Sequence, residues 1–391
     1  MQTTATRRAH GGKDRTECPI PNSIPGLDGL RAFSILLVMA SHSGMQRMLP
    51  GLFGVTVFFF ISGFLITALL VREMDATGRI SLRQFYMRRF LRLYPPLLVF
   101  VGITSAVWLL LGRPMEWLGV FAALTYLTNY LAVFDPSALQ GIGGQLWSLA
   151  VEEHFYLVYP LLLIALFPRR LLTLKVLLAL CALSLAIRTG VVLSFGAHGE
   201  DYASMATECR VDAILFGSAT ALAVREHGRD FVERWTEPHI VAAACAAILA
   251  TFLIRDGLFR ETVRYTIQQA ALVPLVLAVT LTARYGQVNA LLNSRPMVHI
   301  GKLSYSLYLW HLAGLGIGHF VLPGHGVAYA GAVLIGWTAA FLLAMASYRF
   351  VEAPCFALRR RFGSSLHEAA EAQQKADAQT DGAFGSGAKT A

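Results

Sequence analysis

Long apolar runs constrain this chain more than any other feature of its sequence. A run of about 18 or more residues that is nearly free of charge is long enough to cross a bilayer as a helix. Of the 391 residues, 55% are hydrophobic and 15% are charged, whereas a soluble domain carries about 25% charged residues. We therefore predict an all-α integral membrane protein. The runs lie at residues 52–71, 97–112, 171–187, 239–254, 266–283 and 327–347.

Basic clusters between these runs predict the topology, because loops rich in Lys and Arg stay in the cytoplasm. An acidic loop without Lys or Arg, residues 196–208, fits the opposite side. We expect a polytopic bundle of about 10 transmembrane helices with both termini cytoplasmic, in the inner (plasma) membrane of a bacterium. The basic clusters lie at the N-terminus and at residues 72–92, 168–175, 284–302 and 359–361.

Three apolar segments, residues 94–112, 115–133 and 146–167, lie between two of these basic clusters. Two cytoplasmic loops must be joined by an even number of crossings, so one segment within 94–167 is expected to be re-entrant rather than a full span. Part of 134–155 is the expected place, because adjacent carboxylates there are costly in lipid. This part is expected to be re-entrant or to line a cavity.

Two polar regions flank the membrane domain that we predict for residues 26–358. Residues 1–25 are expected to be a cytoplasmic segment, because they lack the apolar core of a cleavable signal peptide. Residues 359–391 are expected to form a basic and then disordered cytoplasmic tail. Cytoplasmic loops explain the formal charge of +9, so no nucleic-acid partner is expected. The five cysteines show no paired spacing, and neither a disulfide framework nor a metal site is expected.

Ionisable side chains inside apolar runs are candidates for function, because they are costly in a membrane. Arg31 and His42 are eleven residues apart, so on a helix they share one face, about 16 Å apart along the axis. A cation near the inner surface suits a phosphate-bearing donor, and a buried imidazole suits proton abstraction or acyl transfer. The alternative is an Arg that reaches the interface and a His at a helix end.

Two further groups stand in the first half of the chain. Arg89 and Arg92 share a helix face at the entrance of a span and could bind phosphates, although a cytoplasmic loop explains them as well. Glu152 and Glu153 are adjacent in an apolar segment, and Ser148 shares a face with the first of them. We expect one carboxylate to orient or deprotonate the histidine, or to act at the acceptor hydroxyl. A structural ion pair with a membrane Arg is the alternative.

Polar residues in the second half supply supporting candidates. Asp212 could hold helices together through an ion pair, and a structural role is equally favoured for Arg210 and Glu352. A group of aromatic residues and a histidine line one end of a later span, where an aromatic belt explains them equally well. The candidates in that span are Lys302, Tyr305, Tyr308 and His311.

The order and wording of these motifs resemble the acyltransferase-3 family of integral membrane O-acyltransferases. Arg31 and His42 form an Arg-x10-His pattern, and the resemblance runs over residues 26–354. The other matching blocks are G-x-x-G-V-x-x-F-F-x-x-S-G-F-L at 51–65, R-x-x-R-L-Y-P at 89–95, W-S-L-x-V-E-E-x-F-Y-L at 147–157, R-x-D-x-x-x-x-G at 210–217, G-K-x-S-Y-x-L-Y-L-W-H at 301–311 and Y-x-x-x-E-x-P at 348–354.

The resemblance implies transfer of an acetyl or other short acyl group from cytoplasmic acyl-CoA, a co-substrate rather than a permanently bound cofactor. The implied acceptor is a hydroxyl of a carbohydrate: a cell-surface polysaccharide, a lipid-linked sugar or a glycosylated metabolite. The family pattern makes His42 the central catalytic residue and places Glu152 and Glu153 on a paired acidic motif. The donor-binding arginines that it implies are Arg31, Arg89 and Arg92.

The sequence departs from the family pattern in two ways. His154 stands where the family often has Gln. Larger members also carry a C-terminal esterase-like SGNH domain, which this sequence lacks, so a small or lipid-linked acceptor or a secreted metabolite is expected. The alternative function is a polytopic transporter or flippase of glycan or lipid intermediates. Such a protein would normally show repeat symmetry between its halves, and none is evident in the sequence.

Overall fold

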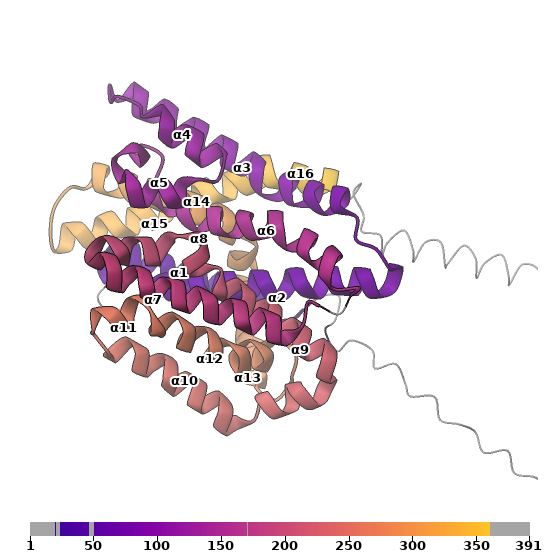
Figure 1. Ribbon diagram of the computed structural model, residues 1–391. Helices are drawn as coiled ribbons and strands as arrows, with labels where there is room; N and C mark the ends of the chain where they lie inside the picture. The colour runs from indigo at the N-terminus through magenta and orange to yellow at the C-terminus, as the bar shows by residue number, and fades with distance from the viewer. Residues whose placement is uncertain (1–19, 21–23, 47–50, 170, 360–391) are drawn as a thin grey trace, which may run out of the picture.

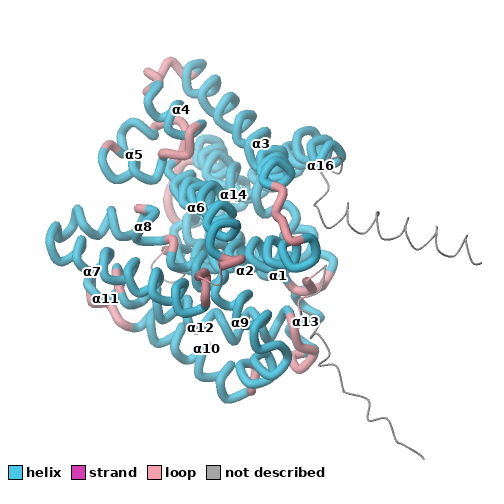
Figure 2. Tube along the Cα trace, turned by 45° about the vertical axis from the view of Figure 1, so that its right-hand side comes forward, coloured by secondary structure: helices cyan, strands magenta, loops and turns pink. Residues whose placement is uncertain are grey.

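The computed structural model describes residues 20, 24–46, 51–169 and 171–359, and within these ranges every regular element is helical. Long helices run side by side through the molecule (Figures 1 and 2). The short helices α4, α5 and α11 lie toward one end, at the left of Figure 1, and the opposite end carries the α2–α3 turn and α16. The polar regions predicted at 1–25 and 359–391 lie almost entirely outside the described residues.

The helices follow in chain order, with η1 and η4 being π-helices and η2 and η3 being 3₁₀ turns. They are α1 (Leu27–Ala40), η1 (Ser41–Met45), α2 (Gly51–Thr77), α3 (Leu82–Leu110), α4 (Trp117–Leu124), α5 (Thr128–Phe134), η2 (Pro136–Leu139), η3 (Gly144–Leu146), α6 (Trp147–Leu166), α7 (Leu174–Met205), α8 (Thr207–Arg210), α9 (Asp212–Trp235), α10 (Pro238–Leu253), α11 (Gly257–Glu261), α12 (Val263–Thr280), α13 (Gly286–Leu292), α14 (Arg295–Val321), α15 (Val327–Ser347), η4 (Tyr348–Glu352) and α16 (Ala353–Arg359).

Six helices of the described chain are long and apolar enough to cross a membrane, or seven if α9 and α10, bent by 82°, form one span. The all-α membrane architecture is therefore confirmed, but the predicted count of about ten spans is not. The central helices α1 and α14 are not among these candidate spans, and each has a physical reason. Helix α1 has only 14 residues before η1, which is shorter than the roughly 20 that a bilayer needs. Helix α14 has 27 residues but carries the buried polar side chains described below.

The segment between α3 and α6 shows which of the three apolar segments is not a full crossing. Residues 115–133 form two short helices, α4 and α5, joined at Tyr126, whose φ is 57°. Residues 147–166 form one helix and are not re-entrant, but part of 134–155 lines cavities, through Gln145, Ser148 and Glu152 among others, which is the other alternative that we gave for this range. Within that range only residues before Trp147 are broken, because Gly141 and Gly143 have positive φ values that end regular structure. The two candidate spans in this part of the chain are therefore α3 and α6.

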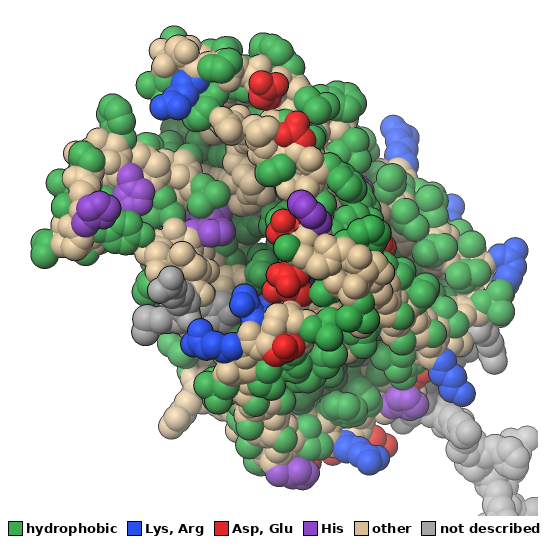
Figure 3. All heavy atoms as spheres, turned by 60° about the vertical axis from the view of Figure 1, so that its left-hand side comes forward, with side chains coloured by type: hydrophobic (Ala, Val, Ile, Leu, Met, Phe, Trp, Pro, Cys, Tyr) green, Lys and Arg blue, Asp and Glu red, His purple; other side chains and the backbone are tan. Residues whose placement is uncertain are grey.

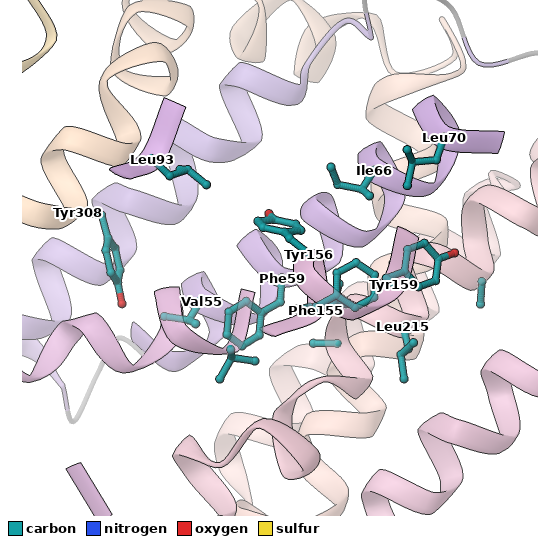
Figure 4. Packing of buried hydrophobic residues seen from close by; sticks show 14 of the residues in the cluster. Val55, Phe59, Ile66, Leu70, Leu93, Phe155, Tyr156, Tyr159, Leu215 and Tyr308 are labelled. Atoms are coloured by element: carbon teal, nitrogen blue, oxygen red, sulfur yellow. The ribbon is translucent and has the colours of Figure 1, made fainter. Parts of the chain in front are cut away.

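Helices α1, α2, α9 and α14 form the closely packed centre of the bundle: α1 packs on both α14 and α2, and α2 packs on α9. Glycines allow this approach, because a Cβ on Gly63 would lie 1.8 Å from a backbone carbonyl oxygen of α9. A Cβ on Gly301 would lie 1.9 Å from the Asp28 carbonyl oxygen of α1. Figure 4 shows how apolar side chains such as Phe59 of α2 and Phe155 of α6 fill the adjoining core.

Candidate active site

Two neighbouring cavities are lined by the central helices α1, α2 and α14. The first, here called the Arg31 cavity, has a volume of about 70 Å³ and is lined by side chains of α1, α2, α3, α6 and α14. The second, the His42 cavity, has a volume of about 720 Å³ and is also bordered by α5, η2, η3 and α12. Figure 3 views the end of the molecule that carries α5 and shows a hollow with acidic, basic and histidine side chains around it.

Val55 and Tyr308 line both cavities and thus form the partition between them. The Tyr308 hydroxyl donates a hydrogen bond of 2.8 Å to the backbone carbonyl of Gln145. Because the single hydroxyl proton of Tyr308 is donated to that carbonyl, the hydroxyl oxygen accepts the 2.6 Å hydrogen bond from Ser148 Oγ. The partition therefore ties α14 to the start of α6, and Phe58 of α2 contacts the Tyr308 ring edge to face at 6.5 Å between centroids.

His42 lies at the His42 cavity, where its ring is exposed. Its contact on the protein side is His311, whose Nε2 is 2.9 Å from His42 Nδ1. His311 is fully buried, and its Nδ1 is 2.7 Å from the backbone carbonyl oxygen of Tyr308. The sequence analysis predicted His42 as catalytic and His311 as a supporting residue, and it did not pair them.

The hydrogen-bond chain fixes the tautomers of both histidines. A carbonyl oxygen can only accept, so His311 Nδ1 carries a proton and, in the neutral ring, Nε2 carries a lone pair. That lone pair accepts from His42 Nδ1–H. The unprotonated nitrogen of His42 is therefore Nε2, the remaining ring nitrogen. A basic nitrogen is thus present in the His42 cavity without a carboxylate partner.

The backbone around His42 holds the ring in place. Helix α1 changes to a π-helix at Ser41, and Gly44, with a φ of 86°, ends it. The positive φ of Gly44 favours glycine at this position, where a Cβ would also lie 2.5 Å from the terminal hydroxyl of Tyr329. Ser43 Oγ donates 2.7 Å to the Met39 carbonyl and accepts 2.8 Å from the Trp337 indole, which ties the turn to α15.

The predicted donor-binding arginines separate into two environments. Arg31 and Arg92 both line the Arg31 cavity, and Arg31 also pairs with Asp28 at 3.5 Å. Arg89 does not line this cavity; its guanidinium stacks on the Tyr156 ring at 4.4 Å. Arg31 and His42 thus face different cavities, although they belong to one helix region.

The paired carboxylates do not contact the catalytic histidine that we predicted for them. Glu152 lines the Arg31 cavity, where it accepts 2.8 Å from Ser62 Oγ. Glu153 forms no hydrogen bond or ion pair with any residue that the structure describes. Helical spacing puts Ser148 and Glu152 on one face, as expected, but that face is turned to the donor-side arginines. The orienting partner of His42 is His311 instead.

A buried ion pair joins α7 to α9. Arg188 Nη1 lies 2.9 Å from Asp212 Oδ2, and both side chains are fully buried. This geometry fits the structural alternative that we gave for Asp212, an ion pair with a membrane Arg. Arg210 instead donates 3.1 Å to Thr56 Oγ1 and stacks on the Tyr265 ring at 3.8 Å.

The other predicted residues, on α14 and η4, do not all line a cavity. Tyr305 lines the Arg31 cavity and donates 2.6 Å to the Leu93 carbonyl. Glu352 is buried and accepts a hydrogen bond from Ser306, which joins η4 to α14. Lys302 is exposed and lines neither cavity.

Several residues of both cavities were missed by sequence reasoning. Gln145 and Tyr265 line the His42 cavity, and Ser62 lines the Arg31 cavity. Arg260 and Arg264 also line the His42 cavity, yet they stand outside the recognised motifs. The one signal that was available is a charge beside an apolar run, which also marks the overlooked Arg188. His154, the departure from the family pattern, bonds Thr207 at 2.7 Å and lines neither cavity.

Comparison of the sequence with known proteins identifies the family of this chain. Its sequence matches the acyltransferase-3 family, described as an acyltransferase domain, over residues 24–349. O-acetyltransferase OatA of Staphylococcus aureus strain NCTC 8325 / PS 47 is 31% identical over 356 residues, which cover 85% of this chain and 57% of OatA. OatA of strain COL gives the same values, so the chain spans somewhat more than half of these relatives. No solved structure matches the chain. The chain therefore belongs to the acyltransferase-3 family.

Proposed function

We propose that this protein is a membrane O-acyltransferase that moves an acetyl or similar short acyl group from acyl-CoA to a hydroxyl of a carbohydrate-containing acceptor. The observation that carries the proposal is the chain from the Tyr308 carbonyl through His311 to His42, which leaves a basic nitrogen in a large cavity. Family membership supports acyl transfer as the reaction.

The donor is assigned to the side of the Arg31 cavity. Arg31 and Arg92 there are cations suited to the phosphates of coenzyme A, and Arg89 adds positive charge nearby. A cavity of about 70 Å³ has room for the acyl end of the donor but not for its nucleotide. The thioester therefore enters this cavity from the side of the basic loops, which we assign to the cytoplasm.

The acceptor is assigned to the His42 cavity, whose volume of about 720 Å³ lies within the range of small-molecule sites. His42 Nε2 removes the proton of the acceptor hydroxyl, and the oxygen attacks the thioester carbonyl. The carbon–sulfur bond then breaks, and the coenzyme A thiolate takes up the proton from His42. The products are the ester and free coenzyme A. His311 stabilises the transient imidazolium by accepting from Nδ1.

The partition at Val55 and Tyr308 has to open for this reaction, because the donor and His42 lie on its opposite sides. The same geometry suits a two-step route in which His42 Nε2 takes the acyl group and passes it to the acceptor. Both routes need an unprotonated Nε2, so both depend on His311.

The test uses purified full-length protein in nanodiscs with acetyl-CoA and a panel of oligosaccharide, lipid-linked sugar and glycoside acceptors. Coenzyme A release and an acetyl mass on one acceptor are expected for the unmodified protein and for His299→Ala. His299 is a matched control, since it is exposed on α14 and lines neither cavity. His42→Ala is expected to lose both signals while keeping its thermal unfolding profile. Normal transfer by a folded His42→Ala protein would refute the proposal.

A further inference from the structure

The charged side chains that line the His42 cavity are of one sign. Its charged lining residues, besides His42, are Arg260 and Arg264, and no Asp or Glu is among the described residues that line it. The neutral polar side chains around them include Gln46, Gln145 and Gln268. Any ligand in this cavity therefore meets positive charge on the α11–α12 side and a basic imidazole on the α1 side.

Neither guanidinium has all of its N–H groups in hydrogen bonds or close ion pairs with the described residues. Arg260 is exposed, and its guanidinium forms no hydrogen bond or ion pair with the residues that the structure describes. Arg264 pairs with Glu261, but at 3.8 Å, and its buried Nε has no hydrogen-bond partner in the described part of the chain. Glu261 also accepts 3.1 Å from the Tyr265 hydroxyl, so its charge is shared. N–H groups of Arg260 and Arg264 are thus available for hydrogen bonds to a ligand in the cavity.

Buried charge behind the cavity wall adds to the positive potential. The wall residue Tyr265 has the guanidiniums of Arg188, Arg210 and Arg264 at 5.3, 3.8 and 5.1 Å from its ring centroid. Arg188 is neutralised by Asp212. Arg210 is fully buried, has no carboxylate partner among the described residues, and leaves Nε and Nη1 without hydrogen bonds. Burial weakens solvent screening, so this charge acts at longer range than at a surface.

We infer that the acceptor bound in the His42 cavity carries an anionic group, a carboxylate or a phosphate ester, which Arg260 and Arg264 bind while its hydroxyl lies at His42. The inference rests on the proposed function for the identity of the cavity and narrows its acceptor class. Arginine binds carboxylate and phosphate through paired, charge-assisted hydrogen bonds. Of the four guanidiniums in and behind this wall, Arg188 and Arg264 have carboxylate ion-pair partners, Asp212 and Glu261, whereas Arg210 and Arg260 have none among the described residues.

The test measures equilibrium binding without acyl-CoA, so it does not require turnover. The full-length protein in phosphatidylcholine nanodiscs is titrated calorimetrically with methyl glucoside, methyl glucuronide and methyl glucoside 6-phosphate. We expect at least one anionic glycoside to bind about tenfold or more tightly than the neutral one, the effect of about 1.4 kcal/mol of charge-assisted contact. The carboxylate and phosphate arms tell which anion is preferred.

Substitutions connect this preference to the two arginines. Arg260→Gln with Arg264→Gln is expected to abolish the preference, whereas Arg264→Lys keeps charge and retains most of it. Arg255→Gln is the matched control, because Arg255 is exposed in the α10–α11 connection and does not line the cavity. If the double variant does not fold, the single variant Arg260→Glu is tested instead, because that side chain is exposed and forms no hydrogen bond or ion pair with the described residues.

Two results would overturn the inference. One is equal affinity for all three glycosides, including no detectable binding of either anionic one at millimolar concentration. The other is an anion preference that survives the arginine substitutions. The proposed function fails separately, by the absence of coenzyme A release and acetylated product, which would leave an observed binding preference intact.

Discussion

Replacement of His311 by Phe tests the hydrogen-bond chain most directly. Phe nearly preserves the volume of the buried ring but removes the acceptor of His42 Nδ1–H, which is 2.9 Å from His311 Nε2. When His42 becomes an imidazolium, this bond involves a charged donor and is worth about 1.5–3 kcal/mol. We therefore expect kcat to fall by about 10- to 100-fold, with KM for the acceptor nearly unchanged, because His311 does not line the acceptor cavity.

His311→Gln is the matched variant for this prediction. Its side-chain oxygen can reach the position of the lost Nε2 and accept from His42, so it is expected to recover part of kcat. The assay follows coenzyme A release under initial-rate conditions, with thermal unfolding of each variant measured in parallel. A kcat for His311→Phe within about twofold of the unmodified protein would refute the tautomer argument. Equal impairment of both variants would assign His311 to packing rather than to hydrogen bonding.

Three further substitutions test the partition, the buried ion pair and the close helix packing. Tyr308→Phe removes two hydrogen bonds of the partition, at about 1 kcal/mol each, and is expected to raise acceptor-independent hydrolysis of acetyl-CoA; an unchanged background rate would argue against a gate. Arg188→Met should lower the free energy of unfolding by about 3–5 kcal/mol by leaving Asp212 buried and unpaired, while adding Asp212→Leu should restore most of it in denaturant titrations. Gly63→Ala should lower the unfolding temperature, whereas Gly102→Ala, with open space around its Cβ position, should not.

Sequence reasoning predicted the fold class, and it selected residues that line the cavities, because polar residues stand out in apolar segments. Arg31, Glu152 and Tyr305 were singled out in this way, and all three line the Arg31 cavity. The even number of crossings between basic loops likewise predicted that one segment of 94–167 is incomplete. These conclusions depend on composition and local spacing, which are visible in one dimension.

Pairings across the chain were not accessible in the same way. His42 and His311 are 269 positions apart, and no local pattern says that they meet. The expectation of a carboxylate beside His42 followed the more familiar triad, yet Glu152 lies with Ser62 at the other cavity. Arg260 and Arg264 lie near the junction of two helices, where basic residues are common. Only the three-dimensional structure shows that both line the same cavity.

The choice of a second imidazole over a carboxylate as the partner of His42 follows from the location of the site. A carboxylate between these helices would bring a charge that their apolar side chains solvate poorly. A neutral imidazole that donates to the Tyr308 carbonyl fixes the same tautomer without any charge in the resting state. The carboxylate Glu152 lies instead at the cavity of Arg31 and Arg92, where opposite charges compensate it. In the proposed mechanism, the base therefore stays uncharged until it accepts a proton, and the fixed charges lie where charged groups of the substrates are expected to bind.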